Sequence, residues 1–517
     1  MAKVLLSISN KIKFFKFFIM LSQQNTLHSY SFNVQLSQKT GEKCSMQLYE
    51  AVSPLDFRYY GGDDTFMKRL LPYVSEAGYV TYQAKVEAAL TRTLANYGVC
   101  SSAIADEVEQ AVDQVTAEEV YEEQRRIRHN IRSLVNVIRS KISPEARPYI
   151  HLFATSADIL DTATALRFKA LIENVIVPDM VELEKQLIGL AREHAETPQI
   201  GRTHGQHAEP ITFGYALALY ISRLGTRIEK IHEAGQNLRG QFSGAVGAFN
   251  GLALIHEHPE QIEADFLALL GLKPSDTHTS TQCVEPEFIS DVAYHVTAAY
   301  TVLANFADDM RHLYRTEIAE VGRKYNPKLV GSSTMPHKVN PEAYENIKSL
   351  WKAFVPRMQT VFLDSILEHQ RDLTNSASSR FLTELLTAFD YSIYRLRRAL
   401  DEMDVKVENM QRNLDMSAED TIAEPIYLLM AYYGFPDAYD HTRKLIAQVH
   451  QTGKSLTTLL WEDETFRPFL DKLTEPQREA LRSPTNYIGA SVRRTHATCD
   501  EWESRVEKLI TSVDNPT

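Results

Sequence analysis

The 517-residue chain contains little cysteine, no long apolar run and no excess of positive charge. No segment approaches the about 20 apolar residues of a membrane-spanning helix. The formal net charge of -12 argues against a general nucleic-acid binder, although a local basic cluster can still bind a phosphate. The four cysteines are widely spaced without a CxxC pair, which argues against a structural zinc or disulfide framework. We therefore expect a cytoplasmic protein with neither nucleic-acid nor membrane partners.

The first 45 residues differ in composition from the rest of the chain. Residues 11–20 interleave lysine with phenylalanine, as a short signal peptide or a membrane-surface helix also does. The apolar run within them is only about four or five residues, shorter than the about 7–15 of a signal sequence. We predict a disordered N-terminal extension over residues 1–45, with the folded protein beginning just after Met46.

Glycine and proline are absent from two long stretches, residues 288–321 and 357–424. Apolar residues recur at helical spacing in the first stretch, which would form a helix about 50 Å long at about 1.5 Å per residue. The polar segment 372–379 is expected to interrupt the second. A third helical stretch, residues 159–196, contains Pro178 as its expected kink or break. Little of the chain alternates as strands do, so we predict an all-α fold built on a long-helix bundle.

The most informative motif is GSSTMPHKVNP, over residues 331–341. Glycine permits a tight turn in which neighbouring N–H groups converge on an anion. Lys338 and Asn340 can then hold a carboxylate, and a serine nearby can take or give a proton. Taken alone, Gly-Ser-Ser is more often an ordinary polar connection between helices.

This segment resembles the signature loop of the fumarase/aspartase superfamily, Ser-Ser-x-Met-Pro-x-Lys-x-Asn-Pro, at every fixed position. His337 is similar to the adenylosuccinate lyase version, since fumarases typically have glycine there and argininosuccinate lyases glutamine. The resemblance implies three domains: an N-terminal helical domain (46–152), a central long-helix bundle with the loop 331–341 (153–410) and a C-terminal helical domain (411–517). It also implies a homotetramer that has the long helices in its core and shares its active sites between subunits.

The resemblance also implies the catalytic residues. His204, in GRTHGQ (201–206), would protonate the departing nitrogen, because an imidazole exchanges protons near neutral pH. A lone histidine is more often structural, but the motif reverses that expectation. Ser332 would remove the proton from the carbon β to nitrogen. Glu345 would orient His204 and stabilise its charged form.

Several similar segments imply the substrate contacts. In HLFATSAD (151–158) the hydroxyls and nearby N–H groups are suited to a carboxylate, unless they serve as a plain helix cap. The arginines of QRDLTNSASSR (370–380) are suited to a nucleotide phosphate, because guanidinium groups form paired hydrogen bonds to phosphate oxygens. The substrate-binding residues implied by these and three further segments are Arg58, Tyr59, His129, His151, Thr155, Ser156, Gln282, Lys338, Asn340, Arg371, Ser376 and Arg380.

The implied reaction is β-elimination of fumarate from adenylosuccinate and from the related imidazole ribotide SAICAR, with no metal or organic cofactor. Phe57 and Phe153 occur where relatives have glycine, and Asn130 replaces an acid. Two alternatives stay open, the second of them because of Phe153 and Asn130. The chain could act on an unphosphorylated succinyl compound, or it could be a non-catalytic relative that retains the scaffold. His337 and the arginines of 370–380 favour a nucleotide substrate.

Overall fold

The computed structural model describes residues 51–328 and 333–514. Residues 52–517 form one compact unit, and the elements below all belong to it. The extension predicted over residues 1–45 lies outside the described residues, as do Gly331 and Ser332 of the signature loop. Within the described ranges, no helix combines the length and the apolar character needed to cross a bilayer.

Short helices with polar N-caps open the compact unit. The Asp63 carboxylate accepts the first free N–H groups of α3, and Ser75 caps α4 in the same way. A reciprocal capping box between Thr116 and Glu119 starts α6. These N-terminal helices are α2 (Pro54–Phe57), α3 (Asp64–Val74), α4 (Glu76–Asn96), α5 (Ser102–Val112), α6 (Ala117–Ile127) and α7 (Asn130–Ser140).

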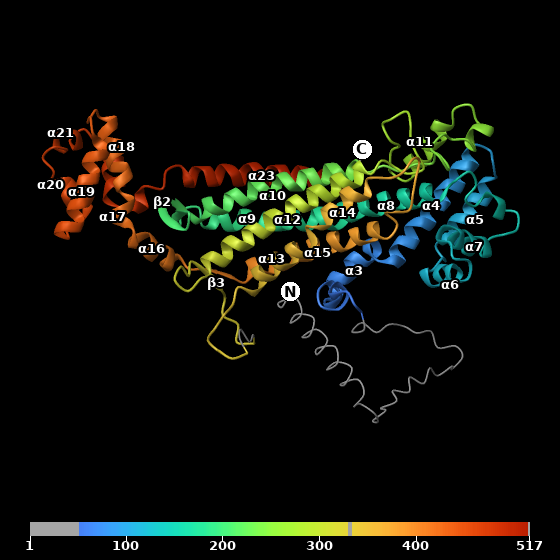
Figure 1. The fold of residues 1–517 in the computed structure, drawn as a ribbon, viewed down its shortest axis with the longest axis horizontal. Coiled ribbons are helices and arrows are strands. Elements are labelled where there is room, and N and C mark those ends of the chain that lie inside the picture. Colours follow the sequence, from blue (N-terminus) through green and yellow to red (C-terminus); the bar gives the residue numbers. More distant parts are fainter. Residues whose placement is uncertain (1–50, 329–332, 515–517) are drawn as a thin grey trace, which may run out of the picture. The chain divides into compact units, whose positions relative to one another are not determined.

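Long helices that lie alongside one another form the central bundle (Figure 1). In it, α10 packs against α9 and α12, and α13 and α15 pack against α12. The helices of this region are α8 (Ser156–Leu171), α9 (Val177–Glu193), α10 (Phe213–Gln236), α11 (Pro259–Leu269), α12 (Glu287–Leu313), α13 (Glu342–Phe354), α14 (Arg357–Asp364) and α15 (Leu382–Asp401).

The breaks in the bundle follow the sequence in part. A π-helical turn, Ile172–Ile176, separates α8 from α9 directly before Pro178, where a kink or break is expected. α12 ends at Leu313, so its 27 residues span about 40 Å rather than the expected 50 Å. The chain turns after it through Ala319, which has a left-handed φ of 49°.

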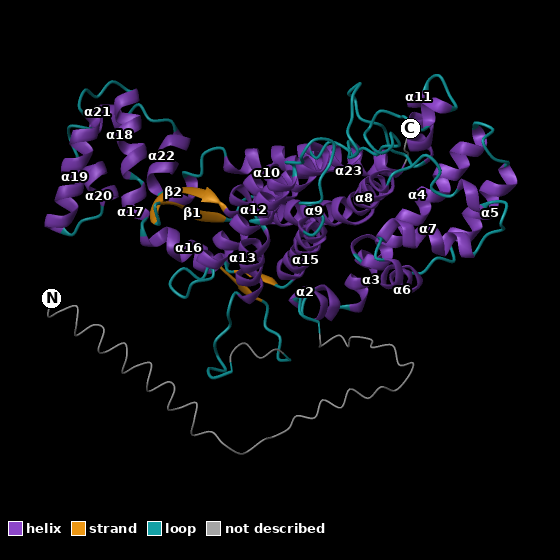
Figure 2. Cartoon of the chain, turned by 45° about the vertical axis from the view of Figure 1, so that its right-hand side comes forward, coloured by secondary structure: helices purple, strands orange, loops and turns teal. Residues whose placement is uncertain are grey.

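Strands are few and short in the described part of the chain, which confirms the all-α prediction. One antiparallel pair consists of β1 (Pro198–Thr203) and β2 (Gln206–Thr212), and the other of β3 (Val321–Arg323) and β4 (Met403–Val405). Figure 2 shows both pairs as small additions to a helical protein.

The C-terminal helices have a separate apolar core. Ile426, Met430, Leu460 and Phe466 are buried within it, apart from the larger core of the bundle. These helices are α16 (Val407–Met416), α17 (Ala418–Thr421), α18 (Ala423–Tyr432), α19 (Ala438–Thr452), α20 (Leu456–Glu462), α21 (Arg467–Leu470) and α22 (Glu475–Arg482).

The last helix, α23 (Ser491–Asp514), packs on the bundle helices α9 and α10. Its Trp502 is buried in the bundle core and covers Gly225 of α10, where an added Cβ would lie 2.2 Å from the indole ring. Residues 411–517 therefore contribute both to the separate core and to the bundle. The three-domain division remains a prediction.

Candidate active site

A cavity of about 800 Å³ lies among α8, the start of α12, α14 and the segment 371–382. It brings together predicted substrate-binding residues that are widely separated in sequence. From the predicted set, the residues that line it are His129, Thr155, Ser156, Gln282, Arg371, Ser376 and Arg380.

The N-terminus of α8 is held firmly at this cavity. Thr155 is the N-cap, and its N–H donates to the Asp158 carboxylate at 2.8 Å. The same carboxylate accepts the N–H groups of Ser243 (3.1 Å) and Gly244 (3.3 Å), which ties the following loop to α8. Burial raises the pKa of Asp158 to about 7, against the lowering effect of these three donors. The first N–H groups of α8 and the Ser156 side chain can thus meet an anion in the cavity.

His151 precedes this turn and does not line the cavity. Its Nδ1 lies 2.8 Å from a carboxylate oxygen of Glu87, which is fully buried in α4. Burial lowers the pKa of His151, but the charge and hydrogen bond of Glu87, together with the charge of Asp158, raise it, and the net shift is upward. Phe153 has a left-handed φ of 67°, which glycine adopts more easily. The chain therefore keeps a glycine-like backbone despite the change to phenylalanine.

The arginines of the segment 370–380 line the same cavity as α8. Arg371 donates to the Cys283 sulfur at 2.9 Å and lies beside Asp161 of α8. Burial raises the pKa of Asp161 to about 6, whereas the Arg371 charge acts to lower it. Arg380 lies 3.6 Å from the Glu76 carboxylate and donates to the Ser376 carbonyl at 3.2 Å. Both guanidinium groups are thus available to a ligand anion.

His129 and Asn130 begin α7 at the edge of the cavity. The Nδ1 atom of His129 accepts the N–H of Arg132 at 3.2 Å, so a neutral ring carries its proton on Nε2. The side-chain oxygen of Asn130 accepts the N–H of Ile131 at 2.8 Å. His129 is the N-cap of α7 and Asn130 is the first residue of the helix, so the Asn130 side chain satisfies one N–H group of the first turn. Gln282, on another wall of the cavity, donates to the Ala245 carbonyl at 2.9 Å.

His204 stands at the tip of the β1–β2 hairpin. His204 and Gly205 form a two-residue turn with φ angles of 54° and 74°, and Thr203 pairs with Gln206 across it. Positive φ at both positions is typical of a type I′ turn, which suits the twist of a hairpin. The turn exposes the imidazole. Sequence reasoning identified this histidine but missed the hairpin.

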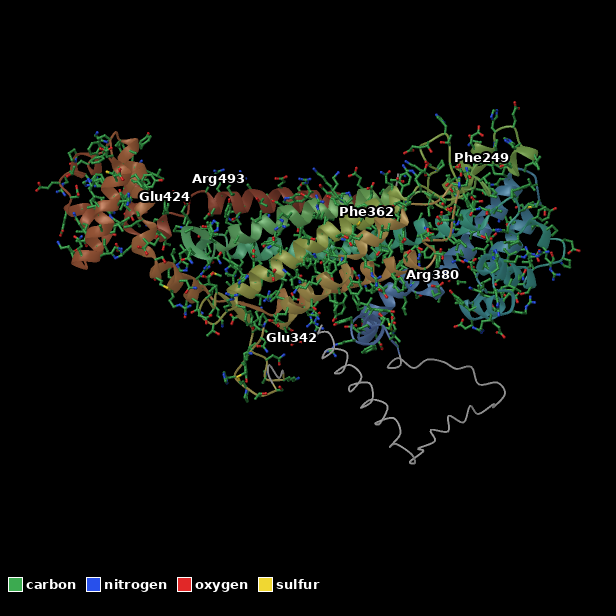
Figure 3. All side chains as sticks on the ribbon, viewed as in Figure 1. Phe249, Glu342, Phe362, Arg380, Glu424 and Arg493 are labelled. Carbon is green, nitrogen blue, oxygen red and sulfur yellow. The ribbon has the colours of Figure 1, made fainter. Side chains whose placement is uncertain are left out.

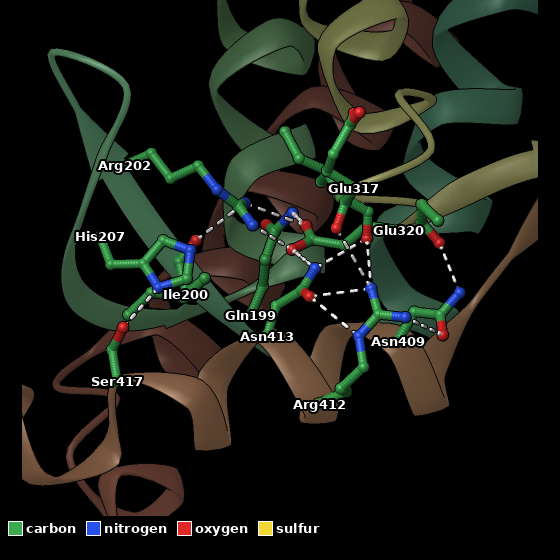
Figure 4. A network of polar contacts seen from close by, with 12 residues as sticks. Gln199, Ile200, Arg202, His207, Glu317, Glu320, Asn409, Arg412, Asn413 and Ser417 are labelled. Carbon is green, nitrogen blue, oxygen red and sulfur yellow. Dashed lines mark hydrogen bonds and ion pairs between the residues drawn. The ribbon is translucent and has the colours of Figure 1, made fainter.

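A buried carboxylate anchors the base of the hairpin, as Figure 4 shows. Glu320 is fully buried and accepts hydrogen bonds from Gln199 (2.7 Å) and from two nitrogens of Arg202 (2.5 and 3.2 Å). Asn413 of α16 donates to it as well, at 2.9 Å. The hairpin, the segment after α12 and α16 are thereby joined at one charged group, which sequence reasoning also missed.

The hairpin and the cavity lie towards opposite ends of the bundle. In Figure 3, Arg380 marks the cavity end, and Glu424 marks the end where a second cavity of about 710 Å³ contains Gly205. Within that second cavity, a hydrogen bond with Glu424 raises the pKa of Glu209. Of the predicted site residues, those placed outside the first cavity are Arg58, Tyr59, His151, His204, Lys338, Asn340 and Glu345.

Between these ends, the rest of the signature loop precedes α13. Lys338 and Glu345 are exposed, and Asn340 lines a small cavity of about 290 Å³. Arg58 is exposed at the end of α2, and the Tyr59 ring lies 5.4 Å from that of Tyr391. A single chain therefore does not assemble His204, Glu345 and the cavity residues into one site, and their roles remain predictions.

Other cavity residues were not identified from sequence. Asp161 and Arg167 of α8 line the cavity together with Ser156. Arg167 follows Ser156 by about three helical turns and so lies on the same face of α8, and that spacing was the signal that could have found it. Among the described residues, no cluster of three or more histidine, cysteine or acidic side chains could hold a metal ion.

The family models and the curated relatives that match this chain are lyases. A family model described as Lyase matches residues 58–353, and one described as Adenylosuccinate lyase C-terminal matches residues 367–487. Adenylosuccinate lyase of Pyrococcus abyssi is 33% identical over 445 residues, which cover 85% of this chain and 95% of that protein. N-acetyl-S-(2-succino)cysteine lyase of Enterococcus italicus is 27% identical over 442 residues, or 82% and 92% of the two chains.

Solved structures share the fold. The 3-carboxy-cis,cis-muconate lactonizing enzyme of Pseudomonas putida matches with a TM-score of 0.73 and 23% identity, over 88% of this chain and 100% of that one.

Proposed function

Because the chain belongs to the adenylosuccinate lyase family of the fumarase/aspartase superfamily, we propose that it cleaves adenylosuccinate to AMP and fumarate. It acts in the same way on SAICAR, the second succinyl nucleotide of purine synthesis. One observation carries this proposal beyond family membership. The cavity combines the helix N-terminus at Thr155 and Ser156, suited to a carboxylate, with Arg371 and Arg380, suited to a phosphate.

The reaction is a β-elimination. A base removes the proton on the carbon β to nitrogen, the electron pair forms the C=C bond of fumarate, and the C–N bond breaks. Ser332 is the proposed base, on the resemblance of its loop alone. His204 then donates a proton to the nitrogen that leaves, so that the purine amine departs neutral.

Charge builds on the succinyl carboxylates as the proton is removed, so their binding groups stabilise the transition state most. Lys338 and Asn340 of the signature loop, with Thr155 and Ser156, are the proposed groups. Glu345 is the proposed partner that keeps His204 charged and oriented. No metal or organic cofactor takes part in this scheme.

The site is proposed to be shared within a homotetramer. The separation of the His204 hairpin from the cavity in one chain supports this, because another subunit must then supply His204. Exposed apolar side chains on α10 (Leu219) and α14 (Phe362, Leu363) support packing of the bundles against one another. The tetramer is expected to be cytoplasmic and to have no nucleic-acid or membrane partner.

The test is ultraviolet absorbance of the purified full-length chain with adenylosuccinate, combined with an independent assay of fumarate. We expect stoichiometric AMP and fumarate, unchanged by a chelator. Failure to form either product with a folded tetramer would refute the proposal.

A lyase that acts on an unphosphorylated succinyl compound is the second candidate. The similarity to N-acetyl-S-(2-succino)cysteine lyase favours it. The need for a phosphate group on the substrate distinguishes the two functions. An adenylosuccinate lyase should lose most of its kcat/KM when the substrate phosphate is removed, whereas the alternative enzyme should not.

A further inference from the structure

Arg167 is a buried guanidinium on the wall of the cavity, and it belongs to none of the sequence motifs. It lies in the last part of α8 with only 6% of its surface exposed. Its guanidinium carbon lies 4.0 Å from the Tyr79 ring centroid and 4.7 Å from that of Phe168. The aromatic rings therefore cover the face of the guanidinium and hold its plane.

The N–H donors of Arg167 are not satisfied by this stacking. Its Nε is enclosed without a hydrogen-bond partner, and no hydrogen bond or ion pair links its terminal nitrogens to any described residue. Burial lowers the pKa of Arg167, yet arginine keeps its charge in proteins. An unpaired buried charge is costly, and the charge of Glu76 offsets it only in part, because no carboxylate among the described residues forms an ion pair with Arg167.

The other arginines that line the cavity differ from Arg167 in burial or pairing. Arg239, Arg357 and Arg380 each have a carboxylate within 4 Å, and Arg371 has the Cys283 sulfur. Six arginines line the cavity, and three of them have carboxylate partners that lie outside its lining, namely Asp276, Glu384 and Glu76. Among the described cavity arginines, Arg167 combines burial with the lack of a carboxylate within 4 Å, which suits an anionic ligand.

The position of Arg167 along α8 indicates which part of a ligand it meets. It follows Ser156 by three helical turns, about 16 Å along the axis. It therefore lies well away from the helix N-terminus that is suited to a carboxylate. Arg380, on the facing segment, lines the same cavity and is close enough for its charge to act on that of Arg167.

We propose that Arg167 is a further specificity-determining residue, which binds the phosphate of the nucleotide together with Arg380. This inference rests on the proposed function, and it adds to that function a residue outside the motifs. The phosphate oxygens would accept from the edge of the guanidinium, while Tyr79 and Phe168 keep its plane fixed. Binding would thus replace an unsatisfied buried charge by a charge-assisted pair.

The experiment compares Arg167→Gln with the wild-type enzyme on adenylosuccinate and on its nucleoside, which lacks only the phosphate. We expect kcat/KM for adenylosuccinate to fall by tenfold or more, mainly through KM, and that for the nucleoside to change less than about threefold. Equal losses on both substrates would overturn the proposal, because they would mean a structural role. Arg128→Gln is the matched control, since Arg128 lines the same cavity but is exposed.

Binding of inorganic phosphate separates this inference from the proposed function, because it needs no turnover. Phosphate should raise the melting temperature of the wild-type protein and of Arg128→Gln, but not that of Arg167→Gln. This result would support the anion site even in a chain without lyase activity. Equal stabilisation of Arg167→Gln would refute the site. The phosphate assignment would also be refuted if succinate, and not phosphate, raised the melting temperature in a way that depends on Arg167. The bound group would then be a carboxylate.

Discussion

Replacing Glu320 by glutamine should loosen the hairpin that bears His204. The carboxylate is fully buried, and two of its hydrogen bonds come from Arg202, whose side chain is only 17% exposed. Glutamine has nearly the same size but carries no charge, and its NH₂ group faces the donors of Arg202 or Asn413. The substitution therefore leaves a largely buried guanidinium without its counter-ion.

The expected cost follows from that burial. Removing one partner of a buried ion pair typically costs about 3–5 kcal/mol, against about 0–1 kcal/mol for an exposed pair. Glu402→Gln supplies the exposed control, because Glu402 lies 2.6 Å from Arg323 and both side chains are over 30% exposed. The loss at Glu320 should appear as local opening of the hairpin, with amide exchange about 10²–10⁴-fold faster.

Hydrogen exchange followed by mass spectrometry over residues 198–212 measures this directly. In the same variant, kcat should fall by at least tenfold, because His204 is no longer held in one position, while the affinity for AMP stays within about threefold. Exchange over residues 198–212 that matches the Glu402→Gln control, together with normal kcat, would refute the reasoning. The hairpin would then be held by its backbone alone.

Four further changes test other parts of the structure. Ser332→Ala should abolish fumarate release and leave substrate affinity within about an order of magnitude, so retained turnover would exclude Ser332 as the base. Arg371→Ala should raise KM for the nucleotide, and an unchanged KM would remove its phosphate assignment. Gly225→Ala should destabilise the protein by about 1–3 kcal/mol in thermal unfolding, because the new methyl group overlaps the indole ring of Trp502. Gly189→Ala is the control, since open space surrounds that position and the change should be neutral or slightly stabilising. Equal melting temperatures of the two variants would contradict the packing of α23. Burial raises the pKa of Glu263 from 4.5 to about 7, so the folded state binds the proton more tightly than the unfolded state does. The free energy of unfolding should therefore fall as pH rises between these values, and Glu263→Gln should make that fall less steep. An unchanged dependence of stability on pH in the variant would contradict the burial effect.

The sequence predicted those parts of the fold and cavity that depend on local signals. Long stretches without glycine or proline indicated the helices, and Pro178 indicated the break that precedes α9. The arginines of residues 370–380 and the hydroxyls of α8 carry recognisable motifs, and the structure brings them to one cavity. Their roles in catalysis remain predictions, since they depend on the proposed sharing of the site between subunits.

The features that were missed depend on tertiary contacts. Glu320 and Arg167 look like ordinary surface residues in the sequence, and only the packing of α16 and of Tyr79 around them makes them buried. After α12 ends at Leu313, the N–H of the buried Glu320 donates to the Leu313 carbonyl at 2.9 Å, a turn that no sequence motif indicated. The strands around His204 are short and polar, so their pairing produced no alternating apolar pattern.

The backbone conformation of His204 limits which substitutions can test the role proposed for its side chain. A residue with a φ of 54° must tolerate a left-handed conformation, which strains β-branched side chains and is incompatible with proline. Asparagine tolerates that conformation and lacks a titratable group. An asparagine variant would therefore remove the proposed proton donor while leaving the loop intact, whereas a valine or threonine variant would disturb both at once.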